Sequence, residues 1–227
     1  MSFKRKKYLV IKKAITNDMA NFIFGYFMMK RRVAKKFLDD RYISPFEEGW
    51  VTWKDKQIPN TYSHYADMVM ETLLEKVRPR MEKETKLKLI PTYSYARIYK
   101  KGDVLARHKD RFSCEISTTM FLGGDHWDIY LEPNKNVGKS PDPYIPTTNK
   151  GIKVTLKSGD MLIYSGCELE TIKAALCNIK KQVKDLSTEQ KKLTAYANMG
   201  RGGLKVILGI GFLLAGLFSI GFFIGQR

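Results

Sequence analysis

His108 and Asp110 are the two residues whose types and spacing point most directly to chemistry. They stand two positions apart at the end of an alternating segment, residues 104–109, that predicts a short strand. Side chains two positions apart on a strand share a face, so the imidazole and the carboxylate can reach one metal ion. One further histidine would complete the set of two histidines and a carboxylate that holds non-haem iron(II) with open coordination positions. The alternative is a surface turn that contains an ordinary histidine and aspartate.

A third ligand is less evident, because the chain has no histidine after His126. Glu168 or Glu170 could supply an oxygen ligand, although acids near the end of a strand are usually solvated. His126 follows the turn at residues 123–125 and is expected to be a turn residue, which would approach the metal only in a rearranged barrel. His64 is expected in the first turn of a helix, where a capping or surface role is favoured over a ligand role.

The elements that must position these residues follow from the spacing of apolar side chains. A cap at residues 16–18 predicts a helix over 19–29 with a basic continuation over 30–36, and an apolar stripe at three- and four-residue steps predicts a second helix over 63–86. From residue 87 the period changes to two. Candidate strands cover residues 8–11, 89–99, 104–109, 115–122, 127–131, 152–156 and 160–164. Two helices followed by many short strands predict an α+β domain whose strands close into a sandwich or barrel.

The C-terminal part of the chain follows other patterns. Apolar residues over 172–193 step alternately by four and three, which indicates a short heptad seam, and residues 187–190 could instead form a capping box that restarts a helix after a bend. The run 206–224 has no charge and is long enough to cross a bilayer, so a transmembrane helix is expected over 204–225. A buried core helix is the alternative.

The charge distribution bears on location and partners. The formal net charge is +17, which favours an anionic partner, and positive charge ahead of the apolar run predicts a single C-terminal span with the N-terminal domain in the cytoplasm. The lysines are dispersed, so nucleic-acid binding is not favoured. The heptad seam and the small residues of the span predict self-association. Cys114, Cys167 and Cys177 form an odd set that fits a reducing compartment.

Residues 14–170 resemble the iron(II)- and 2-oxoglutarate-dependent oxygenases of the prolyl 4-hydroxylase-like class, including the small versions of phage and bacterial genomes. The resemblance is carried by His108-x-Asp110 and by three segments: Tyr93-Ser94-Tyr95-Ala96-Arg97-Ile98-Tyr99, Ser117-Thr118-Thr119-Met120-Phe121-Leu122 and Ser158-Gly159-Asp160-Met161-Leu162-Ile163-Tyr164. It implies a double-stranded β-helix, a squashed barrel with iron in its mouth, flanked by N-terminal helices.

The resemblance also implies the components of a reaction. Its cofactors would be Fe(II), 2-oxoglutarate as co-substrate and ascorbate as an auxiliary reductant, and its substrate a protein or peptide. His108 and Asp110 would bind the metal. Tyr93, Tyr95 and Tyr99 share one side of their strand, and their hydroxyls would bind 2-oxoglutarate, whereas aromatic packing in the barrel is the alternative role for each of them.

The sequence departs from the family pattern after residue 170, where a second metal histidine is expected and Thr171 stands instead. We therefore expect an oxygenase-like domain over 1–170 with a truncated barrel, a helical, coiled-coil-like linker over 171–199, and the span over 204–225. The predicted function is that of a dioxygenase of the hydroxylase type, impaired by the missing histidine. The alternative is a non-catalytic, membrane-anchored binding or structural protein that carries a barrel remnant.

Overall fold

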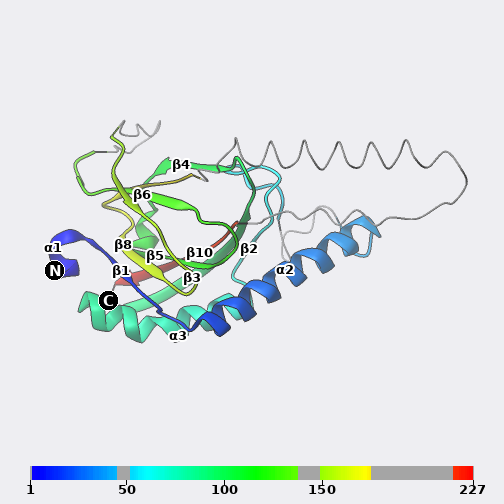
Figure 1. The fold of residues 1–227 in the computed structure, drawn as a ribbon, viewed down its shortest axis with the longest axis horizontal. Helices are drawn as coiled ribbons and strands as arrows, with labels where there is room; N and C mark the ends of the chain where they lie inside the picture. Colours follow the sequence, from blue (N-terminus) through cyan, green and yellow to red (C-terminus); the bar gives the residue numbers. More distant parts are fainter. Residues whose placement is uncertain (1, 45–51, 138–148, 175–216, 227) are drawn as a thin grey trace, which may run out of the picture. The chain divides into compact units, whose positions relative to one another are not determined.

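The computed structural model describes residues 2–44, 52–137, 149–174 and 217–226, whose strands form two antiparallel sheets (Figure 1). The six-stranded sheet contains, in spatial order, β1 (Tyr8–Ile11), β8 (Met161–Ser165), β5 (Ile116–Gly123), β10 (Leu217–Gln226), β3 (Leu89–Tyr99) and β2 (Ser63–Tyr65). The four-stranded sheet contains β4 (Val104–His108), β9 (Glu170–Ala174), β6 (Asp128–Glu132) and β7 (Ile152–Val154). From β3 onward the chain changes sheet after every strand except between β6 and β7. This alternation is a jelly-roll topology and confirms the predicted barrel of strands.

The helices precede most of the strands. α1 (Phe3–Lys6) is a single turn, α2 (Asn17–Asp39) includes the basic continuation, and α3 (Met68–Thr85) runs along the same side of the six-stranded sheet as α2 (Figure 1). The cap of α2 is as predicted, because Thr16 Oγ1 accepts a hydrogen bond from the Met19 amide at 3.2 Å.

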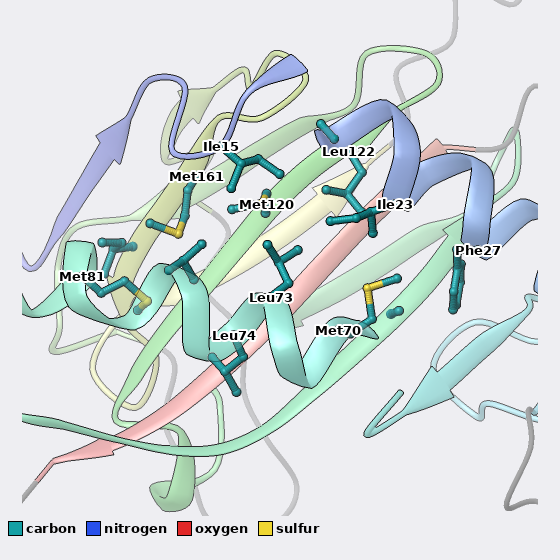
Figure 2. Close-up of a cluster of buried hydrophobic side chains, with 14 of the residues drawn as sticks. Ile15, Ile23, Phe27, Met70, Leu73, Leu74, Met81, Met120, Leu122 and Met161 are labelled. Carbon is teal, nitrogen blue, oxygen red and sulfur yellow. The ribbon is translucent and has the colours of Figure 1, made fainter. Parts of the chain in front are cut away.

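The main core lies between these helices and the larger sheet. Figure 2 shows Leu73, Leu74 and Met81 of α3 gathered with Met120 of β5 and Met161 of β8. These side chains are at most 2% exposed, and burying each stabilises the fold by about 1.5–3 kcal/mol relative to leaving it in water. The core therefore fixes the helices on one face and leaves the other face of the sheet toward the four-stranded sheet.

The prediction of a membrane-spanning helix over 204–225 is wrong for residues 217–225, which belong to strand β10. β10 pairs with β3 on one side and β5 on the other: Ile220 is opposite both Ala96 and Met120. A continuous apolar run fits a strand buried on both faces as well as it fits a helix, and its periodicity cannot separate the two. Residues 204–216 lie outside the described residues. Among the residues that the structure describes, no helix is long and apolar enough to cross a membrane.

The predicted truncation of the barrel is also corrected. Residues 171–174, expected to begin a helical linker, continue strand β9, which pairs with β4 and β6. Hydrogen-bonding partners on both sides outweigh the heptad-like spacing of these few residues. β9 and β10 occupy the interior of the two sheets, so the described barrel has its inner strands. The remainder of the linker, residues 175–199, lies outside the described residues.

The second predicted helix begins later than expected. Residues 63–65 form β2, and α3 starts only at Met68, because the Asp67 carboxylate caps it by accepting from the amides of Val69 at 3.0 Å and Met70 at 3.2 Å. His64 consequently lies on a strand and is 8% exposed, so its prediction as a capping or surface residue is wrong. Burial lowers the pKa of His64 below its ordinary value.

Candidate functional site

The structure brings His108 and Asp110 together at the end of β4. The His108 Nε2 and Asp110 Oδ1 atoms are 3.5 Å apart, and the other ring nitrogen, Nδ1, is 2.7 Å from the carbonyl oxygen of Ala106. A backbone partner at Nδ1 fixes the imidazole orientation and leaves Nε2 for a ligand. The two groups can therefore occupy adjacent positions around one metal ion.

Asp110 is held from behind by the chain around Gly166. Its amide donates to the Gly166 carbonyl at 2.9 Å, and its Oδ2 accepts from the Ser117 hydroxyl at 2.5 Å. A Cβ atom on Gly166 would come within 2.6 Å of Asp110 Oδ2 and would also overlap Ser117. Glycine is therefore required at this position for the carboxylate to sit where it does.

The side chains considered as a third ligand do not join this pair. Glu168 forms an ion pair with Lys7 at 3.0 Å, and the buried Glu170 carboxylate pairs with Arg107 at 3.4 Å. His126 is exposed and stacks on Phe121 with ring centroids 6.2 Å apart, outside the cavity lined by His108. The possible ligand role of Glu168 and Glu170 is therefore not supported, because each carboxylate pairs with a cation. His126 lies exposed just after the turn at residues 123–125, as expected.

The residue opposite His108 on the neighbouring strand is a threonine. Thr171 of β9 is the register partner of His108 across the four-stranded sheet and is 1% exposed. Within the described residues no group of three or more histidine, cysteine, aspartate or glutamate side chains is placed to hold a metal. The site thus fits two protein ligands of a metal ion and does not fit a complete set of three.

Lys173 introduces a cation into the same interior. Its side chain, two positions after Thr171, is 7% exposed, and Nζ donates to the Thr119 hydroxyl at 2.9 Å. Burial lowers the pKa of Lys173 to about 8; the Asp110 carboxylate acts in the opposite direction, and the Arg97 cation acts in the same direction as burial. The Lys173 ammonium group therefore interacts electrostatically with both Asp110 and Arg97.

A cavity of about 420 Å³ contains the predicted residues. Its lining includes His108, Asp110, Tyr93, Tyr95 and Tyr99, together with Asp55, Gln57, Tyr65, Arg97, Leu105, Lys109, Arg111, Cys114, Tyr164 and Lys173. The metal-ligand pair and the three tyrosines thus share one cavity. A larger hollow of about 1000 Å³ lies beside α1, but its lining contains neither His108 nor Asp110 nor the tyrosines of β3.

The tyrosines of β3 differ in their surroundings. Tyr93 stacks on Tyr65 with ring centroids 4.5 Å apart, and its hydroxyl is 3.3 Å from Cys114 Sγ. Burial raises the pKa of Tyr99 to about 12, so its hydroxyl keeps its proton at neutral pH. That Tyr93, Tyr95 and Tyr99 share one face is confirmed, and their binding role stays a prediction.

Arg97 shares this face and was not among the predicted site residues. Its side chain is 3% exposed, and its guanidinium carbon lies 4.9 Å from the Tyr95 ring centroid and 5.5 Å from that of Tyr99. The Asp55 carboxylate forms an ion pair with Arg97 and accepts a hydrogen bond from the Tyr95 hydroxyl. Burial raises the pKa of Asp55, but this hydrogen bond and the Arg97 charge outweigh burial and hold the pKa below its ordinary value.

Sequence reasoning could have found Arg97, because it alternates in step with the tyrosines on one strand. Asp55 and Lys173 carry no such signal. Asp55 lies between the two predicted helices, outside every predicted helix and strand, and Lys173 comes from a segment expected to be helical.

The chain resembles known proteins in its fold. No family model and no curated protein matches the chain. Among solved structures, a prolyl-4-hydroxylase of Pseudomonas putida has a TM-score of 0.52 at 10% identity, covering 99% of this chain and 95% of its own. HygX of Streptomyces hygroscopicus, solved with nickel and 2-oxoglutarate bound, gives 0.56 at 10% identity, covering 99% and 85%.

A third similar structure is SnoN, a non-haem, alpha-ketoglutarate-dependent epimerase of nogalamycin biosynthesis. Its TM-score is 0.59 at 11% identity, with 99% of this chain and 78% of SnoN covered. At such identities the likeness concerns the backbone arrangement alone. The described part of the chain has the fold of the 2-oxoglutarate- and iron(II)-dependent oxygenases.

Proposed function

We propose that this protein is an oxygenase-type domain that binds iron(II) and a 2-oxo acid, with hydroxylation of a protein or peptide as its reaction. The observation that carries the proposal is the His108–Asp110 pair, 3.5 Å between Nε2 and Oδ1, on the wall of a cavity that also contains Arg97 and the β3 tyrosines. Imidazole and carboxylate are suitable donors for iron(II). Iron(II) held there, together with a 2-oxo acid and O2, would supply the oxidation of a C–H bond.

In this proposal one set of residues binds the metal and another binds the 2-oxo acid. His108 and Asp110 hold the metal, and the Ala106 carbonyl and the Ser117 hydroxyl fix their orientations. Arg97 and the Tyr99 hydroxyl are donors for a carboxylate of the 2-oxo acid. Because a third protein ligand is missing from the described residues, we expect metal affinity and turnover below those of a complete site.

Binding and turnover measured on the full chain test this proposal. Iron(II) affinity would be measured anaerobically by calorimetry with and without 2-oxoglutarate, and succinate formation would be followed in air. We expect 2-oxoglutarate to strengthen metal binding, and His108→Ala or Asp110→Ala to abolish it. His126→Ala is the matched control, because that histidine is exposed and away from the cavity. Equal metal binding in all four proteins would refute the assignment.

A non-catalytic binding protein is the second candidate. It is favoured by Thr171 opposite His108 and by the buried Lys173 ammonium in the same cavity, since neither helps to hold a cation. In this case the cavity would bind small anions without a metal. Iron-dependent succinate formation from 2-oxoglutarate, lost in Asp110→Ala, would exclude it.

A further inference from the structure

Arg97 has hydrogen-bonding capacity that its surroundings do not use. Its Nη2 contacts Asp55, the Gln57 Oε1 at 3.3 Å and the Tyr95 hydroxyl at 3.1 Å, while its Nη1 reaches the Tyr99 hydroxyl at 3.5 Å. Within the described part of the chain its buried Nε has no partner. A buried donor without a partner is unfavourable, so this guanidinium can donate to a further acceptor.

Asp55 binds Arg97 through one oxygen only. Its Oδ1 accepts hydrogen bonds from the amide of Gln57 at 2.7 Å and from that of Ile58 at 3.4 Å. This oxygen is therefore engaged by the backbone that directly follows Asp55. Its Oδ2 is the atom that contacts Arg97 and Tyr95. A carboxylate on a guanidinium is held best by two parallel hydrogen bonds, and Asp55 supplies one. Asp55 therefore contacts the Arg97 guanidinium without forming the two parallel hydrogen bonds that this group can donate.

The charge of the cavity also favours another anion. Its lining contains four cationic side chains, Arg97, Lys109, Arg111 and Lys173, and two carboxylates, Asp55 and Asp110. The segment that carries Asp55 belongs to none of the ten strands or the three α-helices of the described residues. Backbone hydrogen bonds between Thr52 and Ser63 tie the start of this segment to β2, and a movement of the Asp55 side chain does not require them to break. Arg97, in contrast, is fixed within β3.

We propose that Arg97, Tyr95 and Tyr99 form a carboxylate-binding site that Asp55 fills from within the chain, and that a small carboxylate ligand binds by displacing Asp55. Asp55 then acts as an internal competitor that sets the affinity of the cavity. A ligand that can bind only when the site is open has its affinity reduced by the fraction of molecules in the open state. The proposal deepens the assignment of a 2-oxo acid to this cavity but needs no metal.

Removal of the competing charge gives the first test. Binding of 2-oxoglutarate, and separately of succinate, would be measured by calorimetry on the full chain in excess EDTA. Asp55→Asn keeps the side-chain shape and the acceptor for the Gln57 amide, and we expect it to bind the dicarboxylates at least about tenfold more tightly than the parent. Asp103→Asn is the matched control, because Asp103 is as buried as Asp55 (12% exposed) but pairs with Lys100 outside the cavity.

A second test uses the unmodified chain and does not depend on folding of the variant. Displacement of Asp55 frees the amides of Gln57 and Ile58, so saturating 2-oxoglutarate should speed their hydrogen exchange while slowing that of the β3 amides. Equal dicarboxylate affinity of Asp55→Asn and parent, absence of binding to both, or unchanged exchange at these two amides would overturn the proposal. Since EDTA is present, these results are separate from metal binding and from succinate formation.

Discussion

His108 of β4 and Thr171 of β9 are direct partners across the four-stranded sheet. Residues directly opposite each other on antiparallel strands place their side chains on the same face, with Cβ atoms about 4.5–5.5 Å apart. Thr171 therefore occupies a place from which a side chain could reach an ion held by His108 and Asp110. A threonine hydroxyl is a weak neutral ligand compared with an imidazole, so the identity of this residue should limit metal affinity.

The first prediction concerns Thr171→His. We expect this substitution to complete a set of two histidines and a carboxylate, and to raise Co(II) or Fe(II) affinity by at least about tenfold, or about 1.4 kcal/mol. Calorimetry and the visible spectrum of the Co(II) complex would measure it. Thr155→His is the matched control, because Thr155 is exposed and its hydroxyl donates to Asp128, which is outside the cavity. A similar gain in metal affinity in both variants would show that the gain does not depend on the place of residue 171 opposite His108.

The second prediction concerns the buried cation at Lys173. Lys173→Met removes a positive charge near Asp110 and keeps a long flexible side chain, so metal affinity should rise several-fold. Dicarboxylate affinity in EDTA should fall, because the cavity loses a cation. Lys153→Met is the control: Lys153 pairs with Asp128 and is 56% exposed. Reduced metal affinity in Lys173→Met would mean that the lysine supports the site in another way.

The site residues show what sequence patterns can and cannot reach. His108, Asp110 and the tyrosines of β3 were predictable because each group depends only on the two-residue period of one strand. Thr171 and Lys173 enter the site through the pairing of β9 with β4, which is far away in the chain, and this register has no local signal. Asp55 enters it through an ion pair with Arg97, 42 positions later, which has no local signal either. The departure at Thr171 was visible in the sequence, whereas its position opposite His108 was not.

The fold shows a similar limit. The jelly-roll strands from β3 to β8 were predictable from alternation and glycine turns, such as the one at Gly102, where φ is +88°. β10 was not, because its unbroken apolar run matches a membrane helix as well as an inner strand. Only the strands on both sides of it, β3 and β5, decide between these structures.

The third prediction follows from this position of β10. Ile220→Pro removes an amide from a strand that is paired on both sides, and proline is hardly tolerated in such a strand. We expect a loss of about 3 kcal/mol or more in the free energy of unfolding, measured by urea denaturation followed by circular dichroism. Ile152→Pro, at the first residue of the edge strand β7, is the control and should cost far less. Equal stability of Ile220→Pro and parent would contradict the pairing of β10.

The fourth prediction concerns the Asp67 carboxylate, which is fully buried and joins two helices. It caps α3 and also accepts from Tyr26 Oη at 2.8 Å and from Lys30 of α2. Burial raises the pKa of Asp67, but the hydrogen bonds from Lys30 and Tyr26 outweigh burial and hold the pKa below its ordinary value. A carboxyl whose pKa is lowered by folding stabilises the fold above its unfolded pKa of about 4, and this contribution is lost as pH falls through the folded pKa.

Asp67→Ala should therefore lower the free energy of unfolding at pH 7 by about 3 kcal/mol, because it leaves Lys30 without its buried partner. The variant should also lose less further stability than the parent between pH 5 and acid conditions, since this carboxylate no longer takes up a proton on unfolding. Urea titrations at several pH values would measure both effects. Asp39→Ala is the control: Asp39 is 59% exposed and pairs with Lys35 on the helix surface, so a change within about 0.5 kcal/mol is expected. If both variants behaved alike, Asp67 would act only as a solvated cap, and the link between α2 and α3 would depend on the apolar core alone.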